Sequence, residues 1–236
     1  MASIAEVELN ILERERRFFL AMALLLAVTA AIGFGYFKFS GKGTNLYSPW
    51  WVHVHSITMI GWLGFFVLQN SLIVSGNVML HRRLGMFGAF YAGWIVFVGM
   101  VLGWAEVAAH RGGFTPPDSM ALNWMNILTF IGLFIAAFRL RQRSDWHKRL
   151  MLCALIILTA PAYGRILILL GVRTNTNFTL FILAYVAIAA FGDLAIRKRL
   201  HPAYLWGFIA AGFMGTMIGV LPLLKPFVAF AEAVAG

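Results

Sequence analysis

The sequence has few of the residues from which soluble proteins build structural or catalytic sites. Its 236 residues include one cysteine and nine acidic residues, and charged residues make up 12% of the chain. A single cysteine, Cys153, excludes an internal disulfide and a zinc site made of several thiolates. A metal site in this chain must therefore take its ligands from histidine, aspartate or glutamate.

Familiar catalytic signatures are also missing. The chain contains no His-Glu-x-x-His motif, no recognisable Ser-His-Asp signature and no phosphate-binding loop. The longest connection between apolar runs, HRGGFTPPDSMALN at 110–123, is rich in glycine and proline and too short to hold a core. We therefore expect no separate soluble domain.

Long apolar runs dominate what the chain does contain. Hydrophobic residues make up 61% of the sequence, and the mean hydropathy is +0.82. A helix needs roughly 20 apolar residues to cross a bilayer. We predict an all-α, polytopic membrane protein, with a cytoplasmic helical segment at 1–17 and a seven-helix transmembrane domain at 18–236. The predicted spans lie near residues 18–38, 51–75, 84–106, 122–139, 149–170, 178–196 and 203–224.

Basic residues set the expected orientation. If the N-terminus is cytoplasmic, thirteen lysines and arginines lie in inner segments and five in outer segments. Cytoplasmic loops carry the excess of basic residues, so we expect the N-terminus inside and the C-terminus outside, in the cytoplasmic (inner) membrane. The formal charge of +10 is then explained by the basic residues of the inner segments, and it predicts no nucleic-acid partner. The expected partner is the lipid bilayer, with other membrane subunits as a further candidate.

Two histidines near the start of the second span are candidate ligands. The stretch WWVHVHSITMIGW, at 50–62, contains His53 and His55. His55 shares a helical stripe with Trp62 and Gln69 at seven-residue steps, whereas His53 lies about 200° around the helix. We therefore expect His55 to face the interior and His53 to cap the helix or meet water.

Three further ionisable residues complete the outer candidates. Glu106 and His110 are four residues apart and share a helix face. Arg165 lies within a span, after an APAYG stretch that favours a bend, and on the same face as His147 eighteen residues earlier. Arg165 either faces the interior near Glu106, which would suit the acidic group of a cofactor, or extends to the head groups. The cofactor candidates are His55, His110 and Arg165, and the metal-ligand candidates are His53, His55, Glu106 and His110.

Three inner turns each carry a histidine among basic residues. The turns are VMLHRRLG, SDWHKRLM and RKRLHPAY, with His81, His147 and His201. An ordinary interfacial role and a three-histidine metal site are both open. On the adjoining helices, Asp193 and Arg197 have the spacing of a local ion pair. Asn123 and Asn126 are placed for capping or interhelical hydrogen bonding.

Several of these motifs carry a family resemblance over residues 48 to 207. The order His-x-His, His-Arg-Arg-Leu-Gly, Asp-x-His-Lys-Arg-Leu-Met resembles a family of bacterial integral membrane proteins of unassigned activity. The resemblance implies a helical membrane architecture and names no reaction. Its motif positions are His53, His55, His81, Asp145, His147, Arg165 and His201.

Three functions remain open at this point. The first is a haem or transition-metal protein with imidazole ligands, in a redox or cofactor-handling role. The second is a non-catalytic membrane subunit or small-molecule binding protein, without a cofactor. The third is an intramembrane metal-dependent hydrolase, which would need three protein ligands and an acid or base.

Overall fold

The protein is built from α-helices. The computed structural model describes residues 4–41, 47–109 and 114–236, and this part of the chain contains no strand. A 3-10 turn, η1 (Leu221–Leu223), joins the last two helices. In chain order the helices are α1 (Ile4–Phe39), α2 (Trp50–Val74), α3 (Val78–Ala108), α4 (Pro116–Arg139), α5 (Ser144–Leu158), α6 (Ala160–Leu169), α7 (Asn175–Arg197), α8 (Ala203–Val220) and α9 (Lys225–Ala235).

The helix lengths confirm a multi-pass membrane protein. Six segments, in α1, α2, α3, α4, α7 and α8, are long and apolar enough to cross a membrane. α5 and α6 together make a seventh candidate, bent by 42°. Large apolar side chains such as Ile57, Phe90 and Phe191 are exposed on the bundle. Such a surface suits contact with lipid rather than water.

The bend between α5 and α6 follows from Pro161. Proline has no backbone N–H, so the helical hydrogen bond to the carbonyl of Ile157, four residues earlier, cannot form. The Asn126 side chain on α4 donates to that carbonyl at 2.6 Å and satisfies it inside the bundle. α1 also packs closely here, because a Cβ atom on Gly33 would lie 2.6 Å from the carbonyl oxygen of Ala162. The predicted bend at APAYG and the predicted interhelical hydrogen bond of Asn126 are therefore both confirmed.

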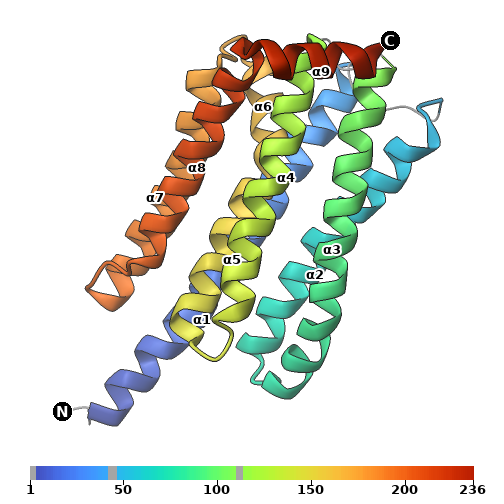
Figure 1. The fold of residues 1–236 in the computed structure, drawn as a ribbon. Helices are drawn as coiled ribbons and strands as arrows, with labels where there is room; N and C mark the ends of the chain where they lie inside the picture. The colour runs from blue at the N-terminus through green and yellow to red at the C-terminus, as the bar shows by residue number, and fades with distance from the viewer. Residues whose placement is uncertain (1–3, 42–46, 110–113) are drawn as a thin grey trace.

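The two termini lie at opposite ends of the bundle (Figure 1). We call these the N-terminal end and the C-terminal end. The α2–α3, α4–α5 and α7–α8 turns lie toward the N-terminal end, and α9 lies across the C-terminal end (Figure 1). α9 contacts α3 and α4, where the Phe230 ring lies 6.0 Å from Trp104 and 5.9 Å from Trp124. The last predicted span ends near residue 224, and α9 was not predicted.

An aromatic core around Trp62 holds α2, α3 and α4 together. Trp62 is 2% exposed, and its ring lies 5.4 Å from Tyr91 and 5.9 Å from both Phe130 and Phe134. Gln69, seven residues further along α2, is also buried. The predicted interior stripe of this helix is therefore confirmed at both positions.

Candidate functional site

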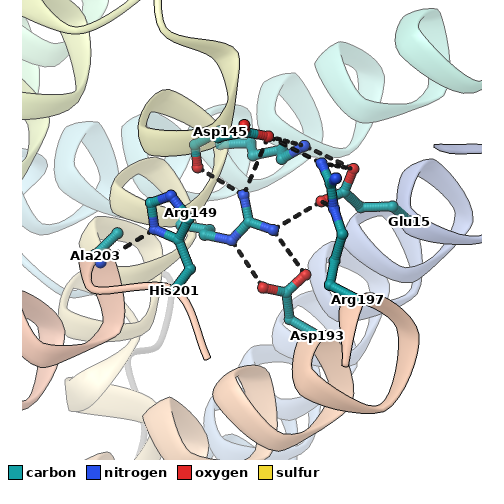
Figure 2. Close-up of polar contacts among 8 residues, drawn as sticks. Glu15, Asp145, Arg149, Asp193, Arg197, His201 and Ala203 are labelled. Carbon is teal, nitrogen blue, oxygen red and sulfur yellow. Dashed lines mark hydrogen bonds and ion pairs between the residues drawn. The ribbon is translucent and has the colours of Figure 1, made fainter. Parts of the chain in front are cut away.

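Six charged side chains join α1, α5 and α7 near the N-terminal end (Figure 2). We call them the charge cluster: Glu15, Asp145, Lys148, Arg149, Asp193 and Arg197. Arg149 lies at its centre and is 2% exposed. Its guanidinium donates to both carboxylate oxygens of Asp193, at 2.7 and 2.9 Å, and to Glu15 at 2.7 Å. One side chain thus connects all three helices.

The remaining members complete the charge balance. Arg197 donates to both oxygens of Glu15, at 2.9 and 3.0 Å, and to Asp145 at 2.9 Å. Lys148 lies 2.7 Å from Glu15. Three acidic and three basic groups give no net formal charge, and each carboxylate has at least one cationic partner. The charge cluster is therefore suited to fixing helices together rather than to presenting a free acid or base.

The predicted local pair of Asp193 with Arg197 is wrong. Both oxygens of Asp193 are taken by Arg149, while Arg197 extends to Glu15 and Asp145. A guanidinium that binds a carboxylate through two parallel hydrogen bonds forms a stronger contact than a single surface pair. Asp193 is fully buried. Two hydrogen bonds from Arg149 therefore satisfy its carboxylate more completely than a contact with Arg197, one turn further along α7, would.

The side chains of His81 and His147 lie next to each other, near the helices that carry the charge cluster. Each is the fourth residue of the second helix in its hairpin, α3 and α5 respectively. The Nδ1 of His81 bonds to the carbonyl of Gln69 at 3.3 Å, and the Nδ1 of His147 to that of Ala137 at 2.9 Å. A carbonyl only accepts, so both Nδ1 atoms carry hydrogen, and in the neutral rings both Nε2 atoms keep a lone pair. The ring centroids lie 6.5 Å apart.

His201 does not join this pair. Its ring packs against Trp146, with centroids 5.1 Å apart, and lies next to the charge cluster (Figure 2). Its Nδ1 accepts a hydrogen bond from the backbone N–H of Ala203 at 3.2 Å. In the neutral ring the proton then lies on Nε2, so neither nitrogen offers a free lone pair. Two members of the inner three-histidine set are therefore assembled, and the third is engaged elsewhere.

The two histidines of α2 lie as the helix spacing predicted. The Nε2 of His53 donates to the carbonyl of Ser48, just before the helix, at 3.0 Å. The Nδ1 of His55 is buried and has no hydrogen-bond partner in the part of the chain that the structure describes. Trp51, one turn earlier, likewise has a buried Nε1 without a described partner. His55 thus faces the interior with unused hydrogen-bonding capacity.

Arg165 also lies on the interior side, near the C-terminal end. Its guanidinium lies 4.2 Å from the ring centroid of Phe34 on α1 and donates to the carbonyl of Pro161 at 3.0 Å. It interacts electrostatically with Glu106 and His55. It therefore points to α1, whereas His147 contacts α3 and α4, and the predicted common face of these two residues is lost across the bend.

The predicted outer ligand set is described only in part. Glu106 accepts a hydrogen bond from Asn123 on α4 at 3.3 Å. His110 lies outside the described residues. Among the residues that the structure describes, no group of three or more histidine, cysteine or carboxylate side chains is placed to hold a metal ion.

Comparisons with family models, curated proteins and solved structures give no match. The class of protein therefore rests on the structure, which defines a helical protein with six or seven candidate membrane spans.

Proposed function

We propose that this is a multi-pass protein of the cytoplasmic membrane that binds a haem or a transition-metal ion through His81 and His147, in a redox or cofactor-handling role. The observation that carries the proposal is the pairing of two imidazoles from separate hairpins, each with Nδ1 bonded to a backbone carbonyl and Nε2 left available. Metal-binding histidines are typically oriented by such a bond on their second nitrogen.

The separation of the rings supports a shared ion. Metal–nitrogen bonds are about 2 Å long, so two imidazoles on opposite sides of one ion hold their centroids roughly 6 to 6.5 Å apart. The observed centroid distance is 6.5 Å. Two protein ligands suffice for haem iron, because the porphyrin supplies four nitrogens. A bare transition-metal ion would need water or other small ligands in its remaining positions.

The test is cofactor content in purified wild type and in His→Asn variants. Asparagine keeps an N–H near the position of Nδ1, so His81→Asn and His147→Asn preserve the donor to the carbonyl and remove Nε2. We expect metal analysis, and a reduced-minus-oxidised spectrum after incubation with hemin, to show loss of binding in either variant. Wild-type protein that stays colourless and metal-free after incubation with hemin, Zn²⁺ and Cu²⁺ would leave the pair as a structural contact between hairpins.

His201→Asn and His53→Asn serve as matched controls. Each removes one imidazole that lies away from the His81–His147 pair and has one ring nitrogen bonded to the backbone, so both variants should keep wild-type cofactor content. Equal loss in all four variants would point to general misfolding instead of a ligand role.

The polar residues at the C-terminal end are a second candidate cofactor site. The specific observation is the buried Nδ1 of His55, which has no partner among described residues and lies in electrostatic range of Arg165. His55 with His110, and Arg165 for an acidic group, would form that site. The hydrolase alternative uses the same region, with Glu106 as acid or base. Loss of the cofactor signal in His55→Asn, with retention in His81→Asn, would move the site here.

The proposed orientation places the N-terminus in the cytoplasm and the C-terminus outside. It is supported by the basic excess in the segments at the N-terminal end. A reporter fused after Gly236 should behave as extracytoplasmic, and a cytoplasmic signal would reverse the assignment.

A further inference from the structure

A cavity of about 300 Å³ lies at the C-terminal end of the bundle, away from the histidine pair. It is bounded by the start of α4, the loop before α7 and the segment from α8 to η1. Its apolar lining is Phe114, Leu122, Phe178, Ile218, Pro222 and Leu223. Leu223 is 78% exposed and Phe114 38% exposed, so the rim is apolar as well.

One cationic side chain lies in this lining. The Arg173 guanidinium lies 4.4 Å from the ring centroid of Phe114 and 5.8 Å from that of Phe178. Its Nε is buried and has no hydrogen-bond partner among the described residues. Arg173 also directly precedes Thr174, the N-cap of the 23-residue helix α7, where the helix dipole adds positive potential. An anionic group in the cavity would be attracted both by the Arg173 guanidinium and by the N-terminus of α7.

One carboxylate lies in the same lining. Asp118, in the first turn of α4, accepts a hydrogen bond from the Thr115 hydroxyl. It interacts electrostatically with Arg173, yet no ion pair of 4 Å or less joins these two described residues. A mostly apolar cavity with one cation and one anion held apart is complementary to a ligand that carries both charges.

We propose that this cavity binds the head group of a phospholipid that has a primary ammonium group, such as phosphatidylethanolamine. The phosphate contacts Arg173, the ammonium contacts Asp118, and the acyl chains leave over Phe114 and Leu223 into the bilayer. The position fits a lipid, since Trp104, Trp124 and α9 lie at the same end of the bundle and tryptophan is enriched at head-group depth. This site does not depend on the proposed cofactor function.

The test measures lipid binding to the detergent-purified full chain by native mass spectrometry. The lipids are phosphatidylethanolamine, phosphatidylglycerol, which lacks the ammonium, and phosphatidylcholine, whose ammonium cannot donate a hydrogen bond. Wild type should bind the first at least fivefold more tightly than the other two. Arg173→Gln should lower binding of phosphatidylethanolamine and phosphatidylglycerol alike, by at least fivefold. Asp118→Asn should remove only the preference for phosphatidylethanolamine.

Lys38→Gln is the matched control for charge. Lys38 is an exposed cation in the last turn of α1, and its replacement should leave the preference unchanged. Leu122→Trp should fill the cavity and weaken binding of all three lipids. Soluble phosphoethanolamine should bind far more weakly than the lipid.

Three outcomes would overturn the proposal. They are equal wild-type binding of the three lipids, unchanged affinity in Arg173→Gln or unchanged selectivity in Asp118→Asn, and equally tight binding of soluble phosphoethanolamine. Thermal melting of each variant separates a lost site from a lost fold.

Discussion

The two ends of the bundle treat their polar groups differently. At the N-terminal end the charge cluster is paired internally, and the Nδ1 atoms of His81 and His147 are bonded to backbone carbonyls. At the C-terminal end buried N–H groups or ring nitrogens lack partners in the described part of the chain: Trp51 Nε1, His55 Nδ1, Trp124 Nε1 and Arg173 Nε. Paired buried groups hold a fold together, whereas unpaired ones weaken it unless water or a ligand completes them. The buried charges at the N-terminal end are thus paired within the protein, although the Gln69 amide and the Tyr204 hydroxyl also lack described partners there. At the C-terminal end the unpaired nitrogens leave hydrogen-bonding capacity that water or a ligand can use.

The largest effect should come from breaking the charge cluster. Arg149→Met leaves Asp193 and part of Glu15 buried without their cation, which should cost about 3–5 kcal/mol of unfolding free energy. Denaturation in detergent checks this, with the exposed Arg139→Met as a control near wild-type stability. A silent Arg149→Met would show that the cluster is dispensable.

A smaller loss of unfolding free energy should follow from removing the hydrogen bond that Asn126 donates at the bend. Asn126→Leu keeps the volume nearly constant and leaves the carbonyl of Ile157 without the donor that replaces the missing N–H of Pro161. An unsatisfied buried carbonyl costs about 1–3 kcal/mol. The same unfolding assay measures it, and a double variant with Pro161→Ala should recover most of the loss by restoring the backbone donor.

Removing an unpaired group at the C-terminal end should cost little. In cofactor-free protein, His55→Leu deletes a buried nitrogen that bonds to no described residue. We expect a change in unfolding free energy within about 0.5 kcal/mol, or a gain in stability. A loss as large as that of Asn126→Leu would remove the contrast between paired and unpaired buried groups.

The smallest effect concerns pH and His201. Burial lowers the pKa of His201 from its ordinary value of 6.5, and the Arg149 guanidinium lowers it further, while Asp145 and Asp193 oppose this. Below pH 6.5 the unfolded chain then binds more protons than the folded one, so stability falls as pH drops through this value. His201→Gln should flatten this part of the curve of melting temperature against pH, and an unchanged curve would contradict the assignment.

The sequence predicted those features that depend on one helix at a time. The interior stripe of α2, the different roles of His53 and His55, and the bend at APAYG all follow from helical spacing or from a missing N–H. α9 was missed because its 11 residues are too few for a span, and it is fixed by aromatic contacts with α3 and α4.

The charge cluster depends on pairing between helices, which spacing along one helix does not reveal. Glu15 was assigned to a segment before the first span, and Arg149 was counted with the basic residues at the inner boundary, where the predicted span 149–170 begins. The signal available was the occurrence of Glu15, Asp145 and Asp193 among so few acidic residues, each near a predicted inner boundary. The four-residue spacing of Asp193 and Arg197 predicted a partner on the same helix for Asp193, whereas its partner in the structure is Arg149 on α5.

The charge cluster also constrains the order in which the protein can be completed. Glu15 and Arg149 are 134 residues apart, and Glu15 and Arg197 are 182 apart. During synthesis Glu15 enters the membrane region early, but its last partner emerges only with the end of α7. A nascent chain that stops after α6 therefore carries Arg149 without Asp193. On such a chain Arg149 still has Glu15 and Asp145 as partners but lacks the two hydrogen bonds to Asp193, so the arrival of α7 is the step that completes the charge cluster.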